Sequence, residues 1–136
     1  ELSTPDARRR YIATFYGSRF WAHPGTFDQE AVDFHTEPFA SAEVLRASFG
    51  GYETVFNVSK NSDMTTMGRN EKTPTLILFG PSDHVIYPAF DQMAAVVFDK
   101  HIGPYLLRDC GHFVPWESPH ALVSGTTAMC SDLLGT

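Results

Sequence analysis

The segment 73–80 constrains the fold of this 136-residue chain more strongly than any other. It runs Thr-Pro-Thr-Leu-Ile-Leu-Phe-Gly, with four successive apolar residues from Leu76 to Phe79, and Pro81 follows it. A strand with one solvated face alternates apolar and polar residues. An unbroken apolar run bounded by glycine and proline instead indicates a strand that is covered on both faces. The chain should therefore contribute to a parallel sheet with helices on each side.

A second strand is predicted shortly afterwards. Residues 89–99 have the spacing of a helix with Met93, Val96 and Val97 on its inner face, and Pro104–Arg108 is a short apolar segment typical of a strand. A strand, a crossover helix and a strand of these lengths make a right-handed parallel unit. Because two buried strands are too few for a stable sheet, we expect an α/β fold of which this chain forms one part.

Residues 1–60 show helical periodicity and many aromatic side chains instead. Helix starts are predicted at polar residues that precede this periodicity. They are Ser3 or Thr4 before Pro5, Thr26 with Gln29 in a capping box, and Ser41. The first helix should continue to just before Pro24-Gly25. The chain thus divides into a helical region over 1–60, a polar linker over 61–72 and a βαβα region over 73–136, whose last helix runs from Ser118 to about Leu134.

The charge balance bears on the partners and the compartment. Ten Lys and Arg against 16 Asp and Glu give a net charge of −6, which disfavours binding to nucleic acid or to an anionic membrane. The cluster Arg8–Arg10 is predicted to be an exposed helix face. The longest apolar stretch, Met93–Phe98, is too short to span a bilayer, and residues 1–10 lack the apolar core of a secretory signal. A cytoplasmic location is expected.

Two polar side chains follow the two predicted strands and are the first candidates for chemistry. Asp83 comes after the first strand and His112 after the second, and parallel strands that pair end at the same edge of a sheet. The carboxylate would fix the imidazole tautomer and stabilise the imidazolium that forms when His112 takes a proton. Each residue alone has a simpler interpretation, since an acid after Gly-Pro-Ser is a common turn residue and a lone histidine is often solvated.

Residues 73–134 resemble the C-terminal part of the α/β-hydrolase fold, in the branch that contains epoxide hydrolases and haloalkane and haloacid dehalogenases. Segment 73–83 is similar to that family's penultimate strand and acid turn. Segment 111–119, Gly-His-Phe-Val-Pro-Trp-Glu-Ser-Pro, is similar to its histidine loop, and residues 1–60 are similar to its helical cap. The resemblance implies that Asp83 is the orienting acid and that His112 is the general base. It also implies a substrate pocket roofed by cap aromatics, with Tyr11, Tyr16, Trp21 and Phe113 as candidate substrate-binding residues.

The family's nucleophile is missing from this sequence. Its members place a nucleophile elbow, Gly-x-Ser-x-Gly or an aspartate counterpart, before the acid and the histidine, and neither pattern occurs in the chain. We therefore expect the chain to be the C-terminal portion of a longer hydrolase, as a truncated form or a cleavage product, and to be inactive alone. A serine nucleophile would imply ester hydrolysis, whereas an aspartate would imply epoxide or carbon–halogen chemistry.

Metal, cofactor and thiol chemistry have weaker support. None of the six histidines has His-Glu-x-x-His spacing, and Cys110 and Cys130 lack Cys-x-x-Cys spacing, so neither a metal nor a cofactor is expected. The two cysteines indicate reduced thiols, with a single bridge between them as the alternative, and Cys110 is expected to be buried or inert.

Two function classes remain open. One is a hydrolase acting on a small apolar ester, epoxide or carbon–halogen bond, whose partners would be the substrate and either the missing N-terminal segment or another copy of the chain. The other is a non-enzymatic interaction module derived from such a hydrolase, which would bind another chain through its open sheet edge.

Overall fold

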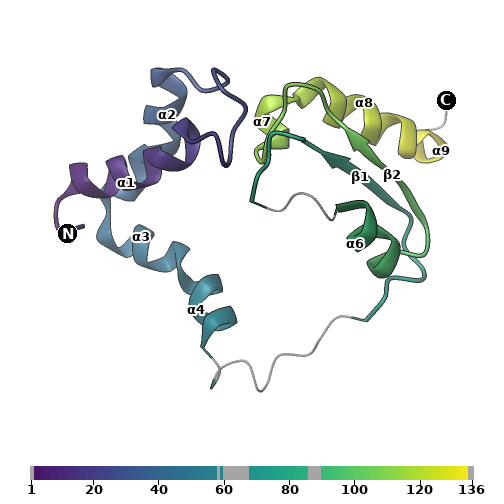
Figure 1. Ribbon diagram of the computed structural model, residues 1–136, viewed down its shortest axis with the longest axis horizontal. Coiled ribbons are helices and arrows are strands. Elements are labelled where there is room, and N and C mark those ends of the chain that lie inside the picture. Colours follow the sequence, from purple (N-terminus) through teal and green to yellow (C-terminus); the bar gives the residue numbers. More distant parts are fainter. Residues whose placement is uncertain (1, 58, 60–67, 86–89, 135–136) are drawn as a thin grey trace. The chain divides into compact units, whose positions relative to one another are not determined.

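The computed structural model describes residues 2–57, 59, 68–85 and 90–134, which are divided into two compact units (Figure 1). The first unit comprises Glu1–Tyr16 and Phe27–Met67, and the second comprises Gly17–Thr26 and Gly68–Thr136. The described residues form helices and one two-stranded parallel sheet, so the fold is mixed α/β. No helix among them is both long and apolar enough to cross a membrane. Most of the predicted linker, residues 61–67, lies outside the described residues.

The first unit is helical. Its elements are α1 (Pro5–Gly17), α2 (Gln29–Thr36), the 3₁₀ helix η1 (Glu37–Ala40), α3 (Ala42–Ser48) and α4 (Gly50–Phe56). Two predicted helix starts are confirmed by their cap hydrogen bonds. The Thr4 hydroxyl accepts from the Ala7 amide at 3.2 Å, and the Ser41 hydroxyl accepts from the Val44 amide at 3.3 Å. Each hydroxyl satisfies one of the amides that a helix leaves unpaired at its N-terminus.

Two predicted helix boundaries are wrong. The first helix ends at Gly17 instead of continuing toward Pro24, because glycine is a poor helix former and the following segment belongs to the second unit. The second helix is capped by Asp28 rather than Thr26, since the cap must directly precede the first helical residue. The Asp28 carboxylate accepts from the Ala31 amide at 2.8 Å.

Arg8 is buried in the first unit, contrary to the prediction of an exposed arginine face, whereas Arg9 and Arg10 are exposed as predicted. Its guanidinium donates to the carbonyls of Leu2 and Ser3, each at 3.0 Å, and to the carbonyl of Ala40. The fork of N–H donors on arginine satisfies several carbonyls at once, which makes burial of the charge tolerable. Arg8 therefore joins the start of α1 to the end of η1, which are far apart in the sequence.

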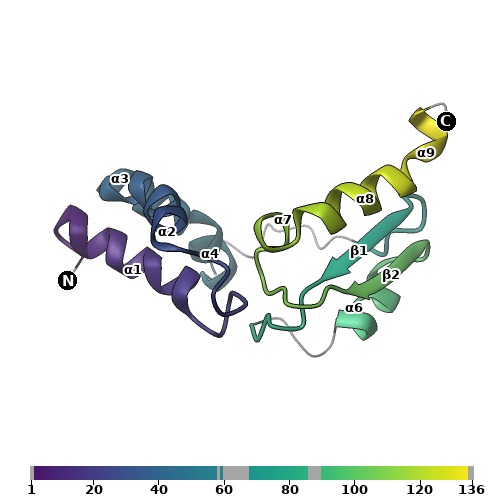
Figure 2. The same ribbon diagram turned by 90° about the horizontal axis from the view of Figure 1, so that it is seen from above.

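The second unit is built on strands β1 (Thr75–Phe79) and β2 (His101–Leu106), which pair in parallel. Helix α6 (Phe90–Val97) packs against β2, and helix α8 (Pro119–Met129) packs against β1. Figure 2 shows these two helices on opposite faces of the sheet. The three α6 side chains predicted to face inward are instead exposed: Met93 by 49%, Val96 by 69% and Val97 by 42%. The short helices α7 (Val114–Glu117) and α9 (Ser131–Leu134) precede and follow α8.

Strand β2 starts three residues earlier than predicted and contains an irregularity. Leu76 aligns with Ile102 and Leu78 with Tyr105, so β2 has one extra residue between these two pairs. The extra residue falls at Gly103-Pro104, where proline has no amide hydrogen for the ladder. The Gly-Pro pair suggested the start of the strand, but in the structure it is a bulge within the strand.

The loops after β1 and β2 come into backbone contact through two glycines. A Cβ atom at Gly80 would lie 2.4 Å from the carbonyl oxygens of both Cys110 and Gly111. A Cβ atom at Gly111 would lie 2.5 Å from the carbonyl oxygen of Trp21. Backbone cannot move aside as a flexible side chain can, so only glycine fits at either position without displacing a loop.

We predict that Gly80→Ala destabilises the second unit. The added methyl group meets two carbonyl oxygens, and overpacking of this kind costs about 1–3 kcal/mol. Gly68→Ala is the matched control, because Gly68 lies in the same unit and a methyl group there would have nothing within 4 Å. Urea unfolding followed by circular dichroism measures both variants, and equal free energies of unfolding would contradict the prediction.

Candidate active site

Asp83 is held in the loop after β1 by its own local hydrogen bonds. The Asp83 amide donates to the Gly80 carbonyl at 3.0 Å, and its carboxylate oxygen Oδ1 accepts from the Val85 amide at 2.9 Å. The preceding residue, Ser82, donates its amide to the Cys110 carbonyl at 3.0 Å, which joins this loop to the one after β2. Asp83 is only 5% exposed. A carboxylate buried to this extent needs partners, and Oδ2 faces His112.

His112 lies in the loop after β2. Its amide donates to the Trp21 carbonyl at 2.6 Å, and its ring nitrogen Nδ1 lies 2.9 Å from Asp83 Oδ2. The prediction that the two side chains meet beyond the ends of adjacent parallel strands is therefore confirmed as geometry. Because an ionised carboxylate only accepts, Nδ1 must carry the proton of this hydrogen bond.

The proton on Nδ1 leaves Nε2 with the lone pair. Nε2 is the nitrogen that can take a proton from water or a hydroxyl group, and the Asp83 carboxylate stabilises the imidazolium that results. The His112 side chain is about one-third exposed, at 31%, while that of Asp83 is 7% exposed. A buried acid beside a more accessible imidazole is compatible with a general-base role for His112.

Glu117, the last residue of α7, binds three backbone amides. Its oxygen Oε2 accepts from His23 at 2.8 Å and from Gly111 at 2.9 Å, and Oε1 accepts from Phe113 at 2.8 Å. Two of these amides flank His112 in the sequence. The third belongs to the segment 17–26, which the carboxylate therefore holds against the histidine loop.

The four predicted substrate-binding aromatics separate into two groups. The rings of Trp21 and Phe113 contact the His112 ring edge to face, with centroids 4.9 and 5.4 Å away. Tyr11 and Tyr16 belong to the first unit, where Tyr11 contacts Phe15, and Tyr16 stacks on His35. Burial raises the pKa of the Tyr16 phenol above its ordinary value.

Ser82 has a histidine partner that the sequence did not indicate. Its hydroxyl lies 3.1 Å from Nδ1 of His23, a residue 59 positions earlier in the chain. The two histidines thus contact adjacent residues of one loop, His23 at Ser82 and His112 at Asp83. A single hydroxyl–imidazole contact supplies no site for a developing oxyanion, which nucleophilic catalysis also needs.

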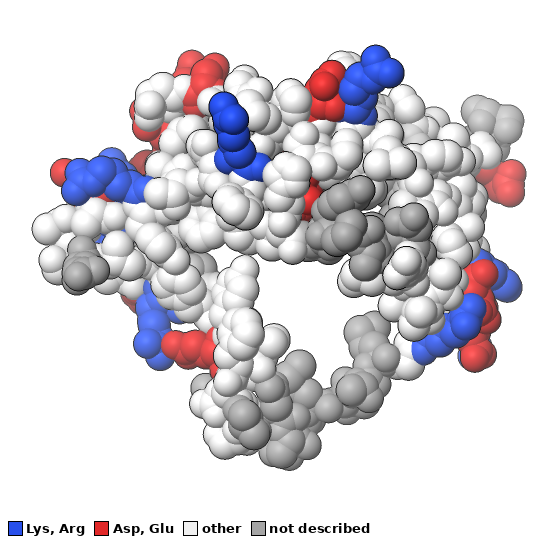
Figure 3. All heavy atoms as spheres, in the orientation of Figure 1, with Lys and Arg blue, Asp and Glu red and all other residues white. Residues whose placement is uncertain are grey.

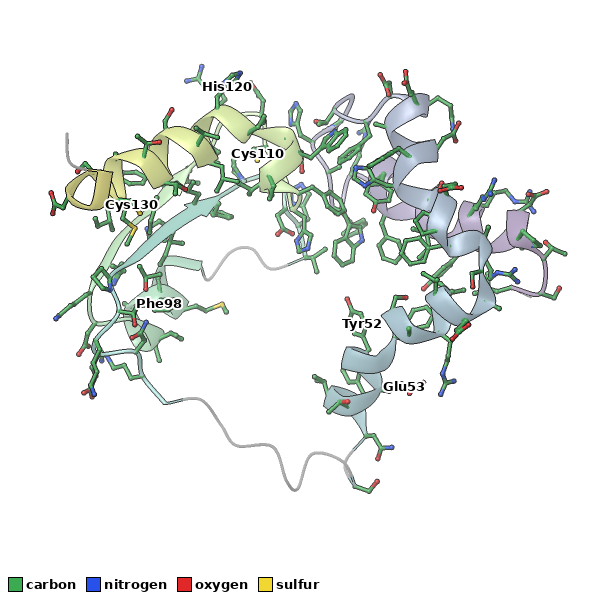
Figure 4. The ribbon with its side chains drawn as sticks, turned by 180° about the vertical axis from the view of Figure 1, so that it is seen from behind. Tyr52, Glu53, Phe98, Cys110, His120 and Cys130 are labelled. Atoms are coloured by element: carbon green, nitrogen blue, oxygen red, sulfur yellow. The ribbon has the colours of Figure 1, made fainter. Side chains whose placement is uncertain are left out.

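Cys110 is fully buried and its thiol donates to the Gly111 carbonyl, with 3.7 Å between sulfur and oxygen. Burial, and secondly the negative charge of Glu117, raise the pKa of this thiol from 9.0 to about 11. It is therefore a neutral thiol at physiological pH and not a nucleophile. Figure 4 shows Cys110 beside α7 and Cys130 at the far end of α8, and both cysteines are free.

The described residues offer little for a metal ion or a polyanion. No group of three or more His, Cys, Asp or Glu side chains among them is arranged to hold a metal. On the face drawn in Figure 3, basic and acidic side chains lie in small groups next to each other among uncharged atoms. The described residues include the ion pairs Arg46–Glu53 and Arg69–Asp99. This distribution suits a solvated surface rather than a phosphate-binding one.

Two residues of the site, His23 and Glu117, were not predicted. Glu117 stands just before Ser118-Pro119, in the segment 111–119 that resembles a histidine loop. A glutamate that follows Gly-His-Phe at helical spacing is placed to reach back to the amides of its own loop, and that was the available signal. His23 had none, because its partners lie 59 and 94 residues away.

Comparisons with known proteins identified no family. The chain matches no protein-family model, and it matches no curated protein.

We predict that iodoacetamide modifies Cys130 in the folded chain and leaves Cys110 unmodified. At about pH 8, raising a thiol pKa from 9.0 to about 11 lowers the thiolate fraction about a hundredfold, and burial further limits access. Peptide mapping by mass spectrometry measures both sites, and unfolding in urea should expose Cys110. Equal rates of modification in the folded chain would show that this loop is open.

Proposed function

We propose that this chain supplies the orienting acid and the general base of an α/β-hydrolase that acts on a small apolar ester, epoxide or carbon–halogen bond. The 2.9 Å contact between Asp83 and His112, in loops that follow paired parallel strands, is the observation that supports this most directly. The aromatic rings of Trp21 and Phe113 beside His112 favour an apolar substrate.

The proposed reaction has two steps. A serine or aspartate supplied by a segment outside this sequence attacks the substrate and forms an ester with it, while the ester C–O, epoxide C–O or carbon–halogen bond at the attacked carbon breaks. A halide leaves as the anion, and an opened epoxide oxygen takes a proton from solvent. With a serine nucleophile, His112 takes the hydroxyl proton and passes it to the departing alcohol. His112 Nε2 then removes a proton from water, and the hydroxide attacks the carbonyl carbon of that ester. The ester bond breaks, the departing oxygen takes the proton from His112, and the nucleophile is restored. Asp83 stays ionised throughout and stabilises the imidazolium.

We predict no turnover by the chain alone and turnover after co-expression with the upstream coding sequence of its gene. An activated ester, a simple epoxide and a haloalkane test the three substrate classes. His112→Ala should then lower kcat by about 10²–10⁴-fold, the usual contribution of a general base. His120→Ala is the matched control, because His120 is exposed on α8.

Either sample could give a result that contradicts the proposed function. Turnover by the chain alone that is lost on Ser82→Ala would identify Ser82 and His23 as a nucleophile and its base. Turnover in the complemented sample that survives His112→Ala would refute the assignment of the base.

The alternative function is a non-enzymatic interaction module, and exposed apolar side chains favour contact with another polypeptide in either case. Val96 of α6 is 69% exposed and Leu106 of β2 is 65% exposed. A cavity of about 450 Å³ lined by residues of β1 and α8, among them Leu78 and Leu122, adds to this apolar surface. Surfaces of this kind mark sites where another protein segment binds.

We predict that the chain forms dimers or aggregates when expressed alone and co-purifies with its upstream segment when that is present. Apolar surface left in contact with water drives either association. Gel filtration with light scattering measures the mass of each species. A monomer with one cooperative melting transition would contradict the prediction.

A further inference from the structure

Glu117 accepts hydrogen bonds from backbone amides that a helix cap alone does not explain. Its bond to the Phe113 amide is local, because Phe113 directly precedes α7 and Glu117 ends that helix. The bonds to Gly111 and His23 are different, since these residues lie outside the helix and His23 is 94 positions away. A helix cap would need only the first of these contacts, so the remaining two require another explanation.

The three contacts converge on the backbone around His112. The amides of Gly111 and Phe113 bind Glu117, and the amide between them, that of His112, binds the Trp21 carbonyl. Three successive amides, those of Gly111, His112 and Phe113, are thereby held by hydrogen bonds. Because Glu117 also holds the segment 17–26 through His23, it places the Trp21 ring against the His112 imidazole.

We propose that Glu117 is a positioning residue for the Asp83–His112 pair. Its carboxylate fixes the histidine loop so that Nδ1 faces Asp83 and Nε2 retains the lone pair. The catalytic importance of this role rests on the proposed function, whereas the contacts of Glu117 do not depend on any substrate. Hydrogen bonds to an ionised acceptor are about twice as strong as neutral ones, which suits a carboxylate that restrains two separate segments.

Neither glutamine nor aspartate can reproduce these contacts. In Glu117→Gln one acceptor oxygen is replaced by an NH₂ group, which opposes an amide N–H instead of accepting from it. In Glu117→Asp the charge remains, but the side chain is one methylene shorter and cannot reach all three amides from the same backbone position. Glu71→Gln is the matched control for loss of charge, because Glu71 is exposed in the same unit.

The test is the ¹⁵N NMR spectrum of the His112 imidazole at about pH 8, where an ordinary histidine is neutral. The unsubstituted chain should show two well-separated ¹⁵N shifts, the pattern of a single tautomer with the proton on Nδ1. In Glu117→Gln these shifts should move toward a common value, because both tautomers become populated, and in Glu71→Gln they should stay unchanged. Unchanged shifts in a folded Glu117→Gln chain would overturn the proposal.

Loss of folding is distinguished from loss of positioning by two further measurements. If Glu117→Gln does not fold, Glu117→Asp decides, and it should show the same convergence to a smaller extent. If that variant does not fold either, hydrogen exchange of the unsubstituted chain decides. The amides of His23, Gly111 and Phe113 should then be protected, and rapid exchange at all three would refute the role.

The complemented enzyme separates this proposal from the proposed function. Glu117→Gln should lower kcat about 10- to 100-fold with little change in KM, as expected when a catalytic group is misplaced. A complemented enzyme without activity, together with the expected NMR changes, would refute the hydrolase function and leave the positioning role intact. An active enzyme whose ¹⁵N shifts and kcat are insensitive to Glu117 would refute the positioning role alone.

Discussion

The site depends on close backbone contact between three chain segments. The loop after β1, the loop after β2 and the segment 17–26 meet where Gly80 faces Cys110 and Gly111 faces Trp21. Two amide–carbonyl hydrogen bonds, from Ser82 and from His112, cross these contacts. Since any side chain at the two glycines would separate the segments, this backbone packing is the constraint from which the positions of the functional side chains follow.

The buried Asp83 carboxylate has hydrogen-bond partners that the surrounding backbone holds in place. Asp83 has little contact with water, and its carboxylate accepts from the Val85 amide and lies 2.9 Å from the His112 ring. Cys110, one residue before Gly111, is also buried. Burial and the nearby Glu117 carboxylate keep its thiol neutral. His112 and Cys110 thus lie in one loop, and they differ in the groups that each side chain contacts.

The two-stranded sheet explains both why Asp83 and His112 meet and why apolar side chains of the second unit remain exposed. Paired parallel strands bring two loops 29 residues apart to one edge, which is how Asp83 and His112 meet. Helices α6 and α8 cover the two faces, yet side chains such as Val96 and Leu106 remain largely exposed. A two-stranded sheet is small for strands this apolar, and this motivates the proposal of a further polypeptide against it.

Elements with local signals could be predicted from the sequence alone. The apolar run 75–79 predicted a strand covered on both faces, and Thr4 and Ser41 predicted their helix caps, because such features depend on neighbouring residues. The order of acid, crossover helix and histidine also predicted the Asp83–His112 contact. The contact between Glu117 and His23 and the burial of Arg8 exist only in the folded chain, since the residues involved are distant in the sequence. Periodicity and spacing describe one element at a time, whereas a carboxylate that binds two remote segments exists only once the chain has brought them together.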